Sequence, residues 1–282
     1  MNAADDLAEA LAFLRRRVAG EYEVDEFGFD PELNDKVLLE LLRPLYRHWF
    51  RVETVGMENV PYDSGALVVA NHSGTVPVDA LMLQVALHDD HPAHRALRLL
   101  GAHLVYELPV LGHLARKSGH TLACPEDADR LLRKGELVGV FPEGYKGVGK
   151  PFSERYRLQR FGRGGFVASA IRAGVPIIPC SIVGAEEIYP KIGDLRFVAR
   201  ALGLPYLPIT PFFPWLGPLG MVPLPSKWMI EFGEPVRTDE FEPDDADDPM
   251  TVFNLTDHVR EIIQHQLNAL RLRRGHAFPL FF

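Results

Sequence analysis

One histidine of this chain stands where a general base would be useful. His72 follows the apolar stretch Ala66–Ala70, and Asp79 lies seven residues further on, just after Pro77. Such an apolar run is typical of a buried strand, and α/β proteins place their sites at the carboxyl ends of strands. Pro77 suits the first turn of a helix, which would contain Asp79. We therefore expect Asp79 to hold one imidazole nitrogen while the other accepts a proton from an alcohol. The simpler alternative is a loop histidine that only caps the helix.

A second group of polar residues follows another strand-like stretch. Leu137–Phe141 is apolar and ends in Pro142, Glu143 and Gly144. Basic side chains come next, and they are Lys146, Lys150, Arg155, Arg157, Arg160 and Arg163. An acid beside so many cations predicts a mixed-charge site that binds phosphate groups of coenzyme A or of a lipid headgroup. The alternative is a solvated loop.

Elements of alternating type must position these residues. Helices are predicted over Val78–His88, Pro109–Lys117, Glu126–Arg133, Gly164–Ala173 and Thr251–Arg273, and further strands over Leu97–Leu104, Val175–Ile182 and Trp228–Phe232. This alternation predicts an α/β fold with a mixed, mostly parallel sheet covered by helices. We expect residues 1–55 to form an amphipathic helical arm, with helices over Ala3–Val18 and Asp35–Val52, and residues 56–282 to form the α/β domain. Residues 239–249 are predicted to be a polar loop.

Two segments carry aromatic side chains that suit a lipid surface. Trp49 and Phe50 stand among arginines in the arm, and Pro205–Pro225 contains Phe212, Phe213 and Trp215 but no charged residue. Rings and cations on an amphipathic helix are typical of the bilayer interface. We expect these five aromatic residues to contact the membrane or to frame an acyl entrance. Packing against the core is the alternative for both segments.

Bulk properties exclude several classes of protein. The formal net charge of −8 argues against nucleic acid as a partner. The acidic N-terminus does not resemble a signal peptide, and the many prolines of the longest uncharged run argue against a spanning helix. The two cysteines favour a reducing compartment. Residues 144–150 match the start of a P-loop, but Pro151 replaces the required hydroxyl residue. The His-rich residues 88–94 lack zinc-ligand spacing, so no metal site is expected.

Three blocks in order resemble the glycerophospholipid acyltransferase family, the PlsC-like lysophospholipid acyltransferases. These blocks are Asn71-His72 with Asp79, then Phe141-Pro142-Glu143-Gly144, then Val175-Pro176-Ile177-Ile178-Pro179. The resemblance covers roughly residues 35–235. It implies a PlsC-like fold, His72 and Asp79 as the catalytic pair, and Glu143 and Gly144 in the acceptor site. It also implies catalysis without a metal or a covalent acyl-enzyme. We expect Asn71, Lys146, Arg157, Arg160 and Arg163 to bind substrate as well.

The chain departs from the usual family pattern in two places. Six residues, not four, separate His72 from Asp79, which resembles the branch related to neutral-lipid acyltransferases. The stretch Gly119–Glu126 lacks the arginine with which lysophosphatidate acyltransferases of the family grip the acceptor phosphate. The acceptor therefore stays open among lysophospholipids, mono- or diacylglycerol and glycolipids.

The resemblance also implies the partners of the protein. The donor would be acyl-CoA or acyl carrier protein, acting as a co-substrate with no separate cofactor, and the protein would lie peripherally on the cytoplasmic face of the cell membrane. Two other readings remain: a catalytically silent lipid-binding protein with this fold, and a hydrolase that uses the same histidine with water.

Overall fold

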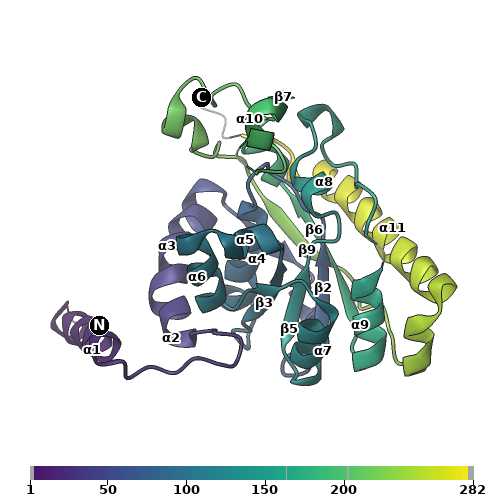
Figure 1. Ribbon diagram of the computed structural model, residues 1–282, viewed down its shortest axis with the longest axis horizontal. Coiled ribbons are helices and arrows are strands. Elements are labelled where there is room, and N and C mark those ends of the chain that lie inside the picture. Colours follow the sequence, from purple (N-terminus) through teal and green to yellow (C-terminus); the bar gives the residue numbers. More distant parts are fainter. Residues whose placement is uncertain (1–2, 163, 202, 279–282) are drawn as a thin grey trace.

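The computed structural model describes residues 3–162, 164–201 and 203–278, and a seven-stranded sheet forms its centre (Figure 1). The strand order is β1-β9-β6-β2-β5-β3-β4, and every neighbouring pair is parallel except β6 and β9. The strands are β1 (Glu53–Val55), β2 (Ala66–Ala70), β3 (Leu97–Gly101), β4 (Thr121–Leu122), β5 (Leu137–Val140), β6 (Ile177–Val183) and β9 (Met229–Phe232). The predicted α/β class with a mixed, mostly parallel sheet is confirmed.

Helices cover both faces of the sheet (Figure 1). The principal ones are α4 (Val78–Asp89), α5 (His103–Glu107), α6 (Pro109–Lys117), α7 (Pro125–Arg133), α8 (Tyr145–Val148), α9 (Gly165–Ala173), α10 (Arg196–Ala201) and α11 (Pro249–Arg274). Short helical turns lie at η3 (Met57–Asn59), η4 (Phe152–Glu154), η5 (Ala185–Glu187), η6 (Gly217–Met221) and η7 (Pro243–Asp247). A separate two-stranded ribbon joins β7 (Gly193–Asp194) to β8 (Pro208–Ile209).

The central strand β2 shows how the sequence builds these layers. Its five residues are all buried, and alternate side chains point to opposite faces. Ala66, Val68 and Ala70 pack into a core cluster with residues of α4, whereas Leu67 and Val69 pack into a second cluster with residues of α7, α9 and α11. A strand covered on both faces needs apolar residues throughout, which explains the unbroken run in the sequence.

Strand register brings the two predicted site segments together. Strand β2 lies beside β5, with Leu67 opposite Val138 and Val69 opposite Val140. Because these strands are parallel, their carboxyl ends meet at one edge of the sheet. The segments that begin at Asn71 and at Phe141 leave the sheet as neighbours.

The N-terminal arm is only partly separate from the domain. It contains α1 (Ala3–Ala19), α2 (Pro31–Leu33), η1 (Asn34–Leu38), α3 (Leu39–Pro44) and η2 (Leu45–Trp49). Leu39, Tyr46 and Phe50 belong to the core cluster beneath α4, and β1 lies within the sheet. This differs from the predicted boundary after residue 55, because apolar side chains before it are needed to cover the sheet. In Figure 1, α1 lies beside the body, where Arg17 pairs with Asp30.

Some predicted bounds are wrong. The predicted strand Leu97–Leu104 ends at Gly101, since α5 begins at His103 and folds back over it. A Cβ on Gly101 would lie 2.9 Å from the Tyr106 hydroxyl, so a larger residue there would require the Tyr106 side chain to shift. The predicted loop at residues 239–249 contains the turn η7. None of the helices formed by the described residues has both the length and the apolar composition that a membrane span requires.

Candidate active site

His72 and Asp79 form a direct hydrogen-bonded pair at the carboxyl end of β2. Asp79 Oδ2 lies 2.8 Å from His72 Nδ1, and it also accepts the backbone N–H of Ser73 over 2.8 Å. The other oxygen, Oδ1, accepts the N–H of Ala80 over 2.9 Å. Asp79 is fully buried, while 14% of the His72 side chain is exposed. This arrangement favours a proton on Nδ1 and leaves the lone pair of Nε2 free for an incoming hydroxyl group.

The six residues between His72 and Asp79 form a loop with two left-handed positions. Gly74 has φ of 95° and Thr75 has φ of 67°. A Cβ on Gly74 would lie 2.8 Å from the carbonyl oxygen of Ala185, so the loop packs closely on η5. Thr75 Oγ1 donates to the carbonyl of Tyr189, and the Thr75 carbonyl accepts the Tyr206 hydroxyl proton over 2.6 Å. The loop of six residues between His72 and Asp79 is therefore held in place by contacts with residues that follow β6.

Asn71 does not face substrate. Its side-chain amide donates to the carbonyl of Ile182 over 3.0 Å and accepts the N–H of the same residue over 2.7 Å. The side chain is fully buried. The prediction that Asn71 binds substrate is wrong, because both of its polar atoms join the end of β2 to β6.

Glu143 holds the backbone at the start of the loop between His72 and Asp79. Its Oε1 accepts the N–H of His72 over 2.9 Å, and its Oε2 accepts the N–H of Gln159 over 2.6 Å. The side chain has no exposed surface. The predicted contact between Glu143 and the acceptor is therefore wrong, since both oxygens are used inside the protein. Gly144 is exposed and initiates α8 with φ of 53°.

Helix α8 packs directly on this loop. A Cβ on Gly147 would lie 2.7 Å from the carbonyl oxygen of His72 and 2.7 Å from Glu143 Cβ. The His72 ring also contacts the ring of Phe141, with 4.5 Å between their centroids. Gly147 thus allows α8 to approach the backbone of His72, and the Phe141 ring packs against the imidazole.

A hollow of about 380 Å³ opens beside α8. Its lining includes Lys146, Lys150, Lys191, Tyr206, Asp194 and Gln159. Lys191 donates to the carbonyl of Gly149 over 2.7 Å and lies over the ring of Tyr206. Of the predicted cationic residues, Lys146 lines this hollow, while Arg157 and Arg160 are exposed and do not line it. Arg163 lies outside the described residues.

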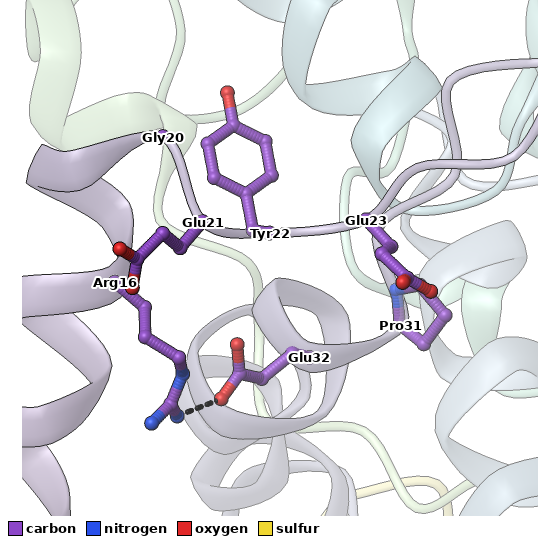
Figure 2. A pocket seen from close by; sticks show the side chains of 7 residues that line it. All are labelled: Arg16, Gly20, Glu21, Tyr22, Glu23, Pro31 and Glu32. Carbon is purple, nitrogen blue, oxygen red and sulfur yellow. Dashed lines mark hydrogen bonds and ion pairs between the residues drawn. The ribbon is translucent and has the colours of Figure 1, made fainter.

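A larger hollow lies in the N-terminal arm. It has a volume of about 680 Å³ and lies between the end of α1 and the start of α2. Figure 2 shows Arg16 paired with Glu32 across it, beside Tyr22. None of the residues in the three family-like blocks lines either hollow. The smaller hollow is linked to the loop after His72, because α8 packs on this loop and the lining residue Tyr206 donates to the Thr75 carbonyl.

The predicted membrane residues divide into two groups. Phe50 is fully buried and stacks on Trp228 with 4.6 Å between ring centroids, so the prediction that it faces lipid is wrong. Trp49 and Phe212 are about 40% exposed, Trp215 is 72% exposed, and Phe213 is half-buried. Trp49 Nε1 donates to the carbonyl of Pro223 over 2.9 Å. This bond joins the arm to the proline-rich segment.

Sequence reasoning missed one buried residue, Glu186, and did not predict that Lys150 is buried. The Lys150 ammonium lies 3.0 Å from Glu186 Oε1 and 3.7 Å from Glu143 Oε2, although the sequence placed it in a phosphate-binding or solvated run. Burial raises the pKa of Glu186 to about 7, and the neighbouring Lys150 only partly opposes this rise. Glu186 follows β6, so the rule that found His72 and Glu143 at strand ends could have found it too.

Fold and site together define an α/β protein with a strand-end His–Asp pair, the arrangement expected for acyl transfer. The model of the Acyltransferase family matches residues 51–183. An uncharacterized protein of Mycobacterium tuberculosis is 60% identical over 278 residues, which are 97% of this chain and 78% of that protein. The chain belongs to the acyltransferase family and is an O-acyltransferase.

Further similarities extend to animals and to a solved structure. A chicken (Gallus gallus) protein described as a DGAT1/2-independent enzyme synthesizing storage lipids is 30% identical over 194 residues, covering 68% of this chain and 54% of that protein. The crystal structure of the 1-acyl-sn-glycerophosphate acyltransferase PlsC from Thermotoga maritima matches with a TM-score of 0.53 and 22% identity. That match covers 86% of this chain and 83% of PlsC, and it supports the fold.

Proposed function

We propose that this acyltransferase moves a fatty acyl group from acyl-CoA or acyl carrier protein to a hydroxyl group of a glycerolipid. The observation that carries the proposal is the 2.8 Å contact between His72 Nδ1 and Asp79, because it leaves Nε2 free at a partly exposed position. Nε2 takes the proton of the acceptor hydroxyl, and the resulting oxygen nucleophile attacks the thioester carbonyl. Backbone N–H groups near the strand ends stabilise the oxyanion. The C–S bond then breaks, and His72 returns the proton to the departing thiolate.

The acceptor headgroup enters the hollow beside α8. Lys146 is exposed at its edge, and Tyr206 connects it to the catalytic loop through Thr75. A cation there suits the phosphate of a lysophospholipid. The stretch Gly119–Glu126 lacks an arginine, and an animal relative is described as synthesizing storage lipids. Monoacylglycerol, diacylglycerol and glycolipids are therefore the alternative acceptors.

Apolar side chains support docking on a membrane. Large exposed ones gather in and near the proline-rich segment, and they are Phe197, Phe212, Trp215, Leu216, Leu219, Met221 and Val222. A cluster of this kind on a water-exposed surface marks an interaction site, and aromatic rings suit the lipid headgroup level. The substrate lipid would then reach His72 from the cytoplasmic face of the cell membrane, with the protein bound peripherally.

Product analysis tests this function. Isotope-labelled acyl-CoA would be mixed with vesicles that contain lysophospholipids, monoacylglycerol, diacylglycerol or glycolipid, and the lipids analysed by mass spectrometry. We expect one acceptor class to become acylated with release of free thiol. His72→Ala should abolish transfer and retain the fold, whereas His258→Ala, on the exposed side of α11, should transfer normally. Labelled free fatty acid without acylated lipid would instead indicate hydrolysis and contradict the proposal.

A further inference from the structure

Lys150 is a buried cation that the transfer chemistry does not use. Only 4% of its side chain is exposed. Its ammonium contacts three oxygens: Glu186 Oε1 at 3.0 Å, the carbonyl of Arg157 at 3.3 Å and Glu143 Oε2 at 3.7 Å. The contact with Glu143 is longer than a hydrogen bond, so it is an ion pair without a shared proton. Lys150 lines the hollow, but its ammonium lies among oxygens of the protein itself.

The two carboxylates that share Lys150 come from different strand ends. Glu143 follows β5 and Glu186 follows β6, and β2 with His72 lies between these strands. Each carboxylate also accepts a backbone N–H from the segment after η4: Gln159 donates to Glu143 over 2.6 Å, and Tyr156 donates to Glu186 over 2.9 Å. The ammonium thus belongs to a buried network that reaches His72 through the Glu143 carboxylate, which accepts the backbone N–H of His72.

We propose that Lys150 is a positioning residue, which holds the Glu143 carboxylate in place so that its Oε1 accepts the backbone N–H of His72. The inference rests on the proposed role of His72 as the base. Removal of the cation would leave the buried Glu143 carboxylate with an uncompensated charge, and its position would then be less firmly fixed. Glu186 holds the ammonium at 3.0 Å, and the ammonium lies 3.7 Å from Glu143 Oε2. The geometry of the base is then set by an ion pair that never touches substrate.

A double-mutant cycle tests whether Lys150 acts through Glu143. Lys150→Met, Glu143→Gln and the double variant would be compared with the native chain in the acyl-transfer assay. We expect Lys150→Met to lower kcat roughly tenfold or more and to change KM for the acyl donor by less than about twofold. In the Glu143→Gln variant, Lys150→Met should lower kcat by less than about twofold, because the carboxylate on which Lys150 acts is already absent. An equal loss on both backgrounds would overturn the proposal.

Hydrogen exchange of the His72 amide supplies a readout that needs no activity. We expect this amide to exchange roughly tenfold faster or more in Lys150→Met and in Glu143→Gln, since both changes weaken its hydrogen bond. Lys117→Met is the matched control, because Lys117 is a largely buried lysine paired with the buried Asp30 over 3.3 Å, at the end of α6. It should lower stability and leave His72 exchange unchanged. Unchanged exchange in a folded Lys150→Met protein would also overturn the proposal.

Conservative variants cover the case in which Lys150→Met does not fold. Lys150→Arg keeps the charge and should retain kcat within about fivefold of the native value, whereas Lys150→Gln keeps hydrogen bonding without charge and should resemble Lys150→Met. Full activity in Lys150→Gln would contradict the inference. If the native chain transfers no acyl group at all, the proposed function fails, and the exchange measurement still decides the role of Lys150.

Discussion

The backbone N–H of His72 donates to Glu143 Oε1 over 2.9 Å. This bond ties the loop after β2 to the segment after β5, and it leaves the His72 ring free to pair with Asp79. Two acids thus hold one histidine in different ways, Glu143 through the backbone and Asp79 through Nδ1. Both are fully buried, so solvent does not compete for either bond.

Asp79→Asn should abolish most of the activity and preserve the fold. The asparagine oxygen can still accept the N–H of Ser73, but its amide group does not select the tautomer with a free Nε2. We expect kcat to fall by roughly 10³-fold to 10⁴-fold, the order found when the aspartate of a serine-protease triad is changed in the same way. Single-turnover transfer and circular dichroism would measure this. Activity within about tenfold of native would contradict the assigned role of Asp79.

Phe50 and Trp215 should respond in opposite ways to truncation. Phe50→Ala removes a fully buried ring that stacks on Trp228, and we expect a loss of about 3 to 5 kcal/mol in the free energy of unfolding. Trp215→Ala removes an exposed ring and should change stability by less than about 0.5 kcal/mol. The Trp215→Ala variant should bind anionic phospholipid vesicles roughly tenfold more weakly than the native chain. Vesicle binding that is unchanged in Trp215→Ala would contradict membrane docking through this segment.

His120 should make the protein sensitive to mild acid. Burial lowers the pKa of His120 to about 4, and the nearby Arg98 guanidinium contributes to this decrease. Between pH 7 and pH 5 the unfolded chain gains a proton at this position and the folded protein does not, so stability falls as the pH falls. The free energy of unfolding decreases by about 2 kcal/mol between pH 7 and pH 5. Urea unfolding at both pH values should show this loss in the native chain and a shallower dependence in His120→Gln.

Glu186 should give the opposite dependence on pH. Its pKa is raised from 4.5 to about 7 by burial, while Lys150 and the N–H of Tyr156 oppose the rise and Glu143 adds to it. The folded protein therefore holds a proton that the unfolded chain has lost, and stability from this group is lost as the pH rises through 7. Between pH 5 and pH 8, the free energy of unfolding of Glu186→Gln should rise by about 2 to 3 kcal/mol relative to that of the native chain. Parallel pH profiles for the two proteins would contradict this account.

Much of the fold could be predicted because its signals are local. The apolar run of β2, the proline before α4 and the glycine after Glu143 each limit the backbone of their own segment, so strand β2 and helix α6 begin and end at the predicted residues. The order of His72, Asp79 and Glu143 along the chain was enough to identify the family, and it predicts the catalytic pair. These features depend on residue type and spacing, which the sequence states directly.

Only the tertiary structure decided which polar and aromatic side chains face substrate or lipid. Asn71, Glu143 and Phe50 have the residue types of a binding site, yet all three are buried by partners more than 70 positions away in the chain: Ile182, His72 and Trp228. Lys150 likewise looked like one of several solvated cations until β5 and β6 brought two carboxylates to it. Burial and charge pairing depend on contacts between distant segments, and these contacts exist only once the sheet has assembled.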